Sequence, residues 1–135
     1  MATAGENMAD VTGPGRYLAK HWRGGFSLGF AYWINGVAIG LVSFAITIAI
    51  GAFIEARAGS LSLTTLRLLI AFIVVGSVVL TVWQFVGIWR SAAAHAGRGG
   101  KRMWAVLAQV AVVAGAIRSV AELVNEAPNL AIIFG

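Results

Sequence analysis

The stretch INGVAIGLVSFAITIAIGAFI, residues 34–54, decides the fold, because it carries no charge over a length that crosses a bilayer. At 1.5 Å per residue, about 20 helical residues span a hydrocarbon core of roughly 30 Å. No charged residue occurs between Arg23 and Glu55, and the hydroxyl of Ser27 is a candidate N-cap. We therefore predict a first transmembrane helix over about residues 31–54.

A second apolar segment, LLIAFIVVGSVVLTVWQFVGIW, separates Arg67 from Arg90 and is also long enough to cross. We predict a second transmembrane helix over about residues 67–90. Helix-forming residues continue beyond Arg90 as far as Gly97, which is a typical C-terminal stop. This helix is therefore expected to protrude by one or two turns from the membrane.

The third segment, MWAVLAQVAVVAGAIRSVAELV, predicts a helix over about residues 103–124. Arg118 and Glu122 lie in its last two turns, so a buried or interfacial helix is the alternative. We favour a span, because the uncharged first part places Arg118 roughly 22 Å along the axis, near the far interface. Pro128 is expected to end this helix and to leave residues 128–135 as a short apolar tail.

The composition of the whole chain agrees with three spans. Of its 135 residues, 59% are hydrophobic and 11% are charged, and the mean hydropathy is +0.86. A soluble domain carries about 25% charged residues, so a water-soluble globular protein is excluded. The chain has no cysteine, which excludes disulfide scaffolds and thiolate metal sites. We predict an all-α integral membrane protein whose three helices form one domain over residues 16–127.

The residues before the first span are expected to form two parts. Residues 1–15 are small, polar and turn-rich, and they predict a disordered tail. The segment RYLAKHWR is expected to form a short interfacial helix with Tyr17, Leu18 and Trp22 on one side. A cleaved signal peptide is not expected, because the first apolar run is too long and begins too far from the N-terminus.

The basic residues predict the orientation. If the N-terminus is cytoplasmic, seven of the ten lysines and arginines lie on the cytoplasmic side. Because cytoplasmic loops carry an excess of basic residues, this orientation is favoured, with a periplasmic C-terminus in a bacterial inner membrane. All five tryptophans then fall toward the cytoplasmic face, as in an aromatic belt. Nucleic acid is not an expected partner, because the basic residues are scattered among the spans. The residues expected to contact anionic lipid headgroups are Arg90, Arg98, Lys101 and Arg102.

Small residues recur at a spacing of four in two of the spans. Gly36 and Gly40 form a GxxxG pattern in the first span, and Ala111 and Gly115 repeat the spacing in the third. Such residues share one helix face and let two backbones approach closely. We interpret them as helix-packing positions, and the pattern leaves open whether they pack within one protomer or between protomers.

Three amides are predicted inside the spans. Gln84 and Gln109 each lie roughly 9 Å inside the cytoplasmic boundary by helical rise, and Asn35 lies nearer to it. If they share one layer, they can hydrogen-bond between helices and hold the bundle together. The alternative is a polar constriction in a pore or a substrate site.

Charged residues near the outer ends of the spans are expected to pair. Arg118 and Glu122 have the i,i+4 spacing of a helical ion pair, and Glu55 at the end of the first span is a second possible partner for Arg118. Charges at this depth are costly and either pair or reach the interface. An ion pathway is the functional alternative.

Residues that would carry catalysis or bind a cofactor are not evident. His21 and His95 are expected to flank the bundle, whereas bis-histidine haem ligation needs both ligands inside it. The chain has no HExxH, Walker A or GxSxG motif. We therefore expect no cofactor or metal and a protein that is not an enzyme.

Four stretches together resemble a known group of sequences: WRGGFSLG at 22–29, YWING at 32–36, WQFVGIWRSA at 83–92 and WAVLAQ at 104–109. The pattern resembles small uncharacterised bacterial inner-membrane proteins with a W-x-G-x-x-S-L start before the first span and V-G-[IV]-W-R-S-A at the end of the second. The resemblance implies a bacterial inner membrane and transfers no catalytic residue. The chain departs from the group after Ser91-Ala92, where a polar residue is common and Ala93-Ala94 stand here.

Two functions fit these observations. The first is a non-enzymatic accessory or scaffold subunit of a bacterial inner-membrane complex, assembled with itself or with larger partners through its small-residue faces. The alternative is a homo-oligomeric channel or small transporter with a polar path near Gln84 and Gln109, to which Ser43, Thr47 and Thr81 would contribute. An enzyme acting on lipid or prenyl substrates is not favoured, because paired acids and a metal motif are missing.

Overall fold

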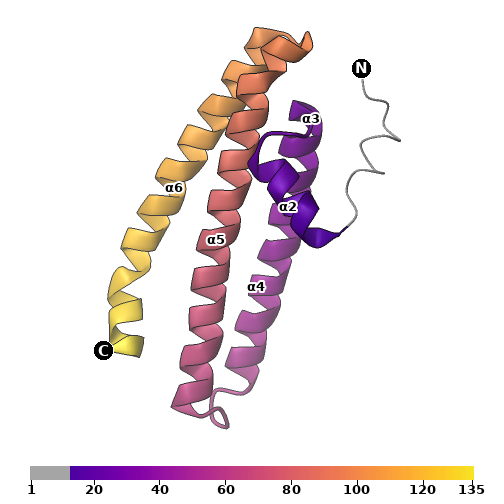
Figure 1. The fold of residues 1–135 in the computed structure, drawn as a ribbon. Helices are drawn as coiled ribbons and strands as arrows, with labels where there is room; N and C mark the ends of the chain where they lie inside the picture. Colours follow the sequence, from indigo (N-terminus) through magenta and orange to yellow (C-terminus); the bar gives the residue numbers. More distant parts are fainter. Residues whose placement is uncertain (1–12) are drawn as a thin grey trace.

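The computed structural model describes residues 13–135, which contain helices and no strand (Figure 1). The helices in chain order are α2 (Pro14–Trp22), α3 (Leu28–Phe30), the π-helix η1 (Ala31–Ala38), α4 (Ile39–Ala56), α5 (Leu63–His95), the 3-10 turn η2 (Ala96–Arg98) and α6 (Arg102–Phe134). The disordered tail predicted over residues 1–15 falls mainly outside the described residues. The prediction is wrong for Pro14 and Gly15, because both residues already belong to α2. Proline is favourable at a helix start, where its missing N–H would have no helical partner.

Three helical stretches are long and apolar enough to cross a membrane: Leu28–Ala56, Leu63–Arg98 and Arg102–Phe134. The prediction of an all-α, multi-pass membrane protein with three transmembrane helices is therefore confirmed. The first stretch joins α3, η1 and α4 without a break. It begins where Ser27 accepts a hydrogen bond from the backbone N–H of Phe30 at 3.4 Å, which is the N-cap that the sequence indicated.

The C-terminal ends of two helices differ from the prediction. The sequence placed the end of the third helix at Pro128, but α6 continues through Pro128 to Phe134. Proline removes one backbone hydrogen bond, and transmembrane helices tolerate it where neighbouring groups hold the rest of the backbone. At the end of α6, Arg67 Nε of α5 donates to the Ile133 carbonyl at 2.8 Å, which has no partner within its own helix. The predicted stop of the second helix, Gly97, lies within η2. The residue with a left-handed backbone is Gly99, two positions later.

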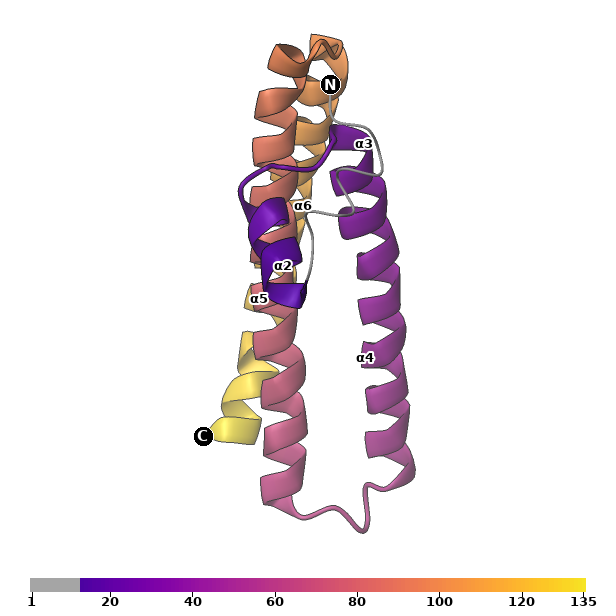
Figure 2. The ribbon, with the colours of Figure 1, turned by 45° about the vertical axis from the view of Figure 1, so that its right-hand side comes forward.

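Helix α5 is the central element of the bundle. It contacts α2, α3, η1, α4 and α6, whereas α4 and α6 lie on different sides of it and share little contact (Figures 1 and 2). Helices α5 and α6 run antiparallel and form the most extensive pair. The short helix α2 lies along the C-terminal half of α5 (Figure 2). The order of the chain therefore brings the N-terminal segment back onto the end of the second span.

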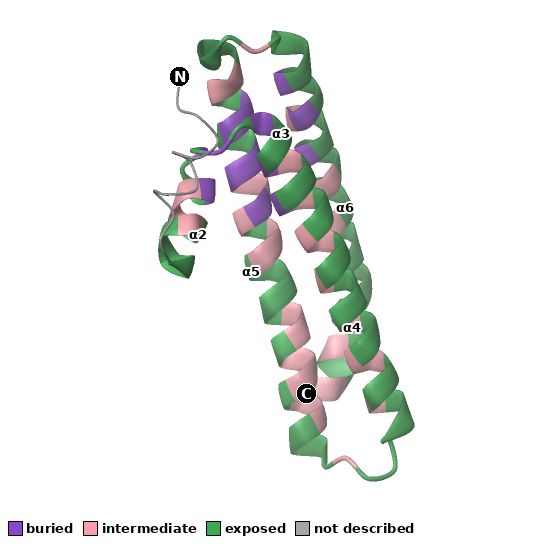
Figure 3. Ribbon diagram, turned by 90° about the vertical axis from the view of Figure 1, so that its right-hand side faces the viewer, coloured by how far each residue is buried: buried purple, intermediate pink, exposed green. Residues whose placement is uncertain are grey.

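The buried residues are concentrated at one end of the bundle, near the α5–α6 connection, and we call this part the packed end (Figure 3). Toward the α4–α5 loop the residues are exposed or half-buried, and α4 itself has no buried residue. The buried apolar residues of the packed end are Phe26, Leu28, Ala31, Ile88, Ala92, Ala105, Ala108 and Val112.

The small residues are used unequally within the protomer. A Cβ on Gly36 would lie 2.9 Å from Ile88 Cδ1, and one on Gly115 would lie 2.9 Å from the Phe85 ring. Both glycines therefore let their helices approach α5 closely. Ala111, which shares the four-residue spacing with Gly115, is exposed instead. The face of α6 that packs on α5 has a spacing of three, four and three residues: Ala105, Ala108, Val112 and Gly115.

Because burial is confined to the packed end, a larger side chain is expected to lower stability there and to have little effect on exposed α4. Ala92→Leu inserts three carbons where the alanine is 1% exposed, and overpacking of this kind costs about 1–3 kcal/mol. Ala45→Leu makes the same change at an exposed site on α4 and is expected to leave stability within error. Unfolding of the full chain by titration with SDS measures both midpoints. Equal midpoints for the two variants would contradict the described packing.

Candidate functional site

The buried polar residues of the packed end form one cluster among α2, η1 and α5. Helix α2 presents Tyr17 and His21 to the bundle, one turn apart on the same face, and His21 is completely buried. The expectation that Tyr17, Leu18 and Trp22 share one side of this helix is not met by burial, because Leu18 and Trp22 are exposed. The prediction that His21 flanks the bundle is also wrong, because its ring is buried against α5 and accepts a hydrogen bond from Asn35 of η1.

A chain of hydrogen bonds fixes the protonation of His21. The Tyr17 hydroxyl donates to Asn35 Oδ1, and Asn35 Nδ2 donates to His21 Nδ1 at 2.9 Å. Since an amide nitrogen only donates, Nδ1 of the ring is the acceptor, and the neutral ring carries its hydrogen on Nε2. That Nε2 is buried without a hydrogen-bond partner in the described part of the molecule.

Helix α5 forms a slot for the His21 ring. A Cβ on Gly87 would overlap the imidazole, so the ring rests directly on the backbone of α5. The indole of Trp83, one turn earlier, lies beside it with ring centroids 4.3 Å apart. Glycine at position 87 therefore permits α2 to dock.

The π-helix η1 meets α5 at the same place. Gln84 Nε2 donates to the backbone carbonyls of Asn35 at 2.6 Å and Gly36 at 3.2 Å. A π-helix has i→i+5 hydrogen bonds and a locally altered backbone, which frequently marks functional sites. Here the altered backbone directs two carbonyls to the Gln84 amide. Asn35 and Gln84 thus share a polar layer between two helices.

Gln109 does not belong to this layer. It is half-buried, and no hydrogen bond joins it to Asn35 or Gln84 among residues 13–135. Ala108 faces α5, and successive helical residues point about 100° apart, so Gln109 is turned aside. The expectation that three amides share one layer is therefore wrong for Gln109.

Donors on α5 and η2 bind the carbonyls of the segment from α2 to α3. Trp83 Nε1 donates to the Leu18 carbonyl at 3.0 Å and Arg90 Nη1 to that of Trp22 at 2.9 Å. Arg98 donates to the carbonyls of Gly24 at 2.5 Å and Phe26 at 2.7 Å. The Trp22 carbonyl ends α2 and has no partner within its own helix, and a cation such as Arg90 is favourable there.

Two of the basic residues expected to contact lipid headgroups also bind the protein. Arg90 and Arg98 donate to the backbone and are still exposed, so their contact with headgroups stays a prediction. The guanidinium of Arg90 also lies 5.3 Å from the Trp22 ring centroid. Gly24 has a φ of +73°, and a Cβ there would lie 2.7 Å from the Arg90 backbone. This close approach requires glycine.

Burial controls the charge state of both titratable groups on α2. Desolvation lowers the pKa of His21 below its usual value, and the nearby Gln84 carbonyl offsets part of this effect without making a well-formed hydrogen bond. Desolvation raises the pKa of Tyr17, which the hydrogen bond to Asn35 partly offsets. Both side chains are therefore neutral near pH 7, and their interior position needs no counter-charge.

Away from the packed end, α6 carries one ion pair between Arg118 and Glu122. Arg118 Nε lies 2.7 Å from Glu122 Oε1, and both side chains are largely exposed. Glu55 makes no ion pair with Arg118 in the described residues, so the second proposed partner is not used. Residues 13–135 also contain no group of three histidine or acidic side chains that could hold a metal ion.

The polar cluster coincides with the motifs of the sequence resemblance. The motif containing Trp22 and Gly24 meets the motif containing Trp83, Gly87 and Arg90 across the α2–α5 contact. The residues that sequence reasoning missed are His21 and Tyr17, whose i,i+4 spacing was the available signal. Comparison with protein-family models, with curated proteins and with solved structures finds no match to the chain.

The close fit of the His21 ring on Gly87 generates a prediction. Gly87→Ala places a methyl group within the imidazole, so α2 must shift, at an expected cost of about 1–3 kcal/mol. Gly76→Ala, at a position on the same helix with nothing within 4 Å, is expected to stabilise α5 by up to about 1 kcal/mol. SDS unfolding gives the stability, and trypsin cleavage after Lys20 reports on α2. Two variants that respond alike would rule out the slot.

The lowered pKa of His21 generates a second prediction. The stabilisation from the neutral ring is complete above the usual histidine pKa of about 6.5 and is lost as the pH falls through the lowered value of the folded state. The neighbours of the ring on η1 and α5 are Asn35, Trp83, Gly87 and the Gln84 carbonyl, and none of these groups titrates. Acidification is therefore expected to release α2 before the rest of the bundle unfolds.

Hydrogen-exchange protection factors of α2, followed from about pH 7.5 to about pH 5, test this effect across the usual histidine pKa. His21→Gln is expected to abolish the loss of protection at acidic pH, and His95→Gln, which alters the other histidine, is expected to retain it. Identical pH profiles for the native chain and His21→Gln would show that another group controls docking.

Proposed function

We propose that the chain is a non-enzymatic accessory or scaffold subunit of a bacterial inner-membrane complex, with its N-terminus in the cytoplasm and its C-terminus in the periplasm. The observation that carries the proposal is the lack of buried residues on α4. This helix has no buried residue and only limited contact with α5, although it is long enough to cross the membrane. Transmembrane helices associate through close packing, and α4 finds little of it within the protomer.

The use of the polar residues also supports a non-enzymatic role. The Asn35 amide bonds to His21 on α2, the Gln84 amide donates to the η1 carbonyls, and His21 is completely buried, so these side chains hold helices together. Catalytic sites instead present groups with shifted pKa values in an accessible cleft. The cluster has the properties of a structural joint between α2 and the spans.

A homo-oligomeric channel is the alternative function. Two of the residues proposed to line its path already have partners in the protomer, because Gln84 binds the η1 carbonyls and Thr47 Oγ1 donates to the Ser43 carbonyl at 3.0 Å. A hydroxyl bonded to its own helix contributes less to a polar path. These contacts favour the accessory role over the channel.

Native mass spectrometry of the full chain, extracted gently from its own membrane, tests the proposal. We expect a fixed stoichiometry with a different membrane protein. A photo-crosslinking residue in place of Val42, which is exposed on α4, is expected to capture that partner, whereas one in place of the exposed Trp104 on α6 is the matched control. A closed homo-oligomer without other subunits would favour the channel, and a monomer would contradict both functions.

A further inference from the structure

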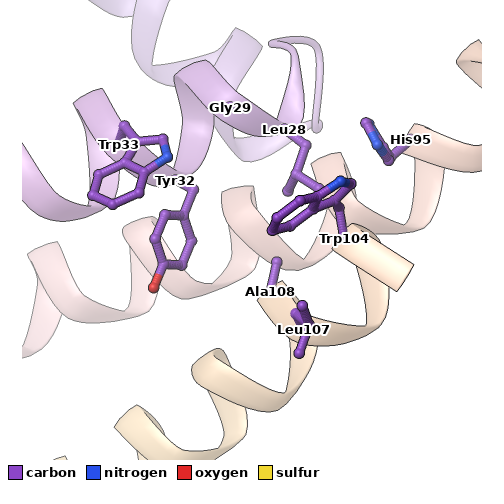
Figure 4. A pocket seen from close by; sticks show the side chains of 8 residues that line it. All are labelled: Leu28, Gly29, Tyr32, Trp33, His95, Trp104, Leu107 and Ala108. Carbon is purple, nitrogen blue, oxygen red and sulfur yellow. The ribbon is translucent and has the colours of Figure 1, made fainter. Parts of the chain in front are cut away.

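A cavity of about 520 Å³ opens at the packed end, between the start of the first span and the start of α6 (Figure 4). Its walls are largely apolar and aromatic. The residues that define it include Leu28, Tyr32, Trp33, His95, Trp104 and Leu107. Figure 4 shows the rings of Tyr32 and Trp104 directed into the same space from η1 and α6. The volume lies within the range of roughly 300–1,000 Å³ that is typical of small-molecule sites.

A second cavity of about 180 Å³ continues along the same line. Tyr32 borders both cavities, and the second one then passes Gly36 of η1, Phe85 of α5 and Ala111 of α6. We call the two cavities together the η1–α6 groove. Because α4 and α6 share little contact, the groove has α5 as its floor and is open between its two walls.

The charges around the groove are of one sign. In residues 13–135 the acidic side chains are Glu55, Glu122 and Glu126, and all three lie toward the other end of the spans. Lys101 and Arg102 directly precede the α6 wall of the groove and are exposed. Arg90 and Arg98 donate hydrogen bonds to backbone carbonyls, whereas the side chains of Lys101 and Arg102 make no such bond among residues 13–135.

We propose that the η1–α6 groove binds one anionic phospholipid from the surrounding bilayer, with its phosphate near Lys101 and Arg102 and an acyl chain between η1 and α6. Three observations support a lipid. Aromatic rings line the groove at the position of the interfacial belt, its interior is apolar, and its mouth is basic without acidic neighbours.

A transmembrane helix of a partner fits the groove less well. An α-helix with its side chains is about 10–12 Å across, which is large for a cavity whose inner part holds about 180 Å³. Clustered basic residues at a membrane interface are typical of sites for anionic lipid headgroups. The lipid proposal does not depend on the accessory role, since it concerns the isolated chain.

The test uses the full chain in nanodiscs that contain equal amounts of phosphatidylcholine and phosphatidylglycerol. Native mass spectrometry after release counts the lipids that stay bound. We expect one phosphatidylglycerol to be retained at least fivefold more often than one phosphatidylcholine. A basic side chain near anionic headgroups contributes a factor of about five. Equal retention of the two lipids would overturn the proposal.

Two pairs of variants locate the lipid. Gly29→Leu extends into the cavity from a position with nothing within 4 Å, and it is expected to reduce retained phosphatidylglycerol at least fivefold. Gly51→Leu, at an equally open position in the outer part of α4, is expected to leave retention unchanged. Loss of lipid in both variants, or in neither, would place the lipid outside the groove.

The second pair separates the phosphate contact from net charge and does not disturb the packed interior. Lys101→Gln with Arg102→Gln is expected to remove the preference for phosphatidylglycerol, whereas Arg23→Gln with Arg57→Gln lowers the net charge equally and is expected to keep it. If both double variants lose the preference to the same extent, the attraction is a general charge effect and the proposed phosphate position is wrong. All four variants are compared at matched helical content by circular dichroism.

Discussion

The packed end of this protein depends on burying a neutral histidine between α2, η1 and α5. An imidazole removed from water requires hydrogen-bond partners, and Asn35 supplies one of them from η1. The ring also requires room on α5, which Gly87 provides. Each requirement joins a different element to α2. Trp83 and Arg90 also donate to carbonyls of α2, and Arg98 donates to carbonyls of the segment that follows it.

Lipid alters the balance of forces in the spans themselves. Apolar side chains gain little by leaving lipid for a protein interior, so helix contacts there depend on close packing and on hydrogen bonds. The packed end has both, through Gly36, Gly115 and the bond from Gln84 to η1. Helix α4 has no buried residue, and its Thr47 hydroxyl donates to a carbonyl of its own helix. This difference explains why burial is confined to one end (Figure 3).

The two ends consequently suit different neighbours. The packed end has buried residues and an aromatic groove near Lys101 and Arg102 in the sequence. Aromatic walls and neighbouring basic side chains suit an anionic lipid. Helix α4 offers a long helical surface with small residues, no buried residue and only limited contact with α5. A subunit that binds lipid at one end and a protein partner along another helix would sit stably within a larger membrane assembly.

The sequence by itself determined the membrane-spanning fold, because the length and apolarity of three segments follow from composition alone. It also determined local features within one turn of helix, such as the Ser27 cap and the spacing of Arg118 and Glu122. The tertiary structure decided the burial of His21 and the separation of Gln109 from Gln84. These outcomes depend on which residues far apart in the chain face each other. A local pattern does not contain that information, since one polar side chain is equally compatible with water, headgroups or a partner across a helix contact.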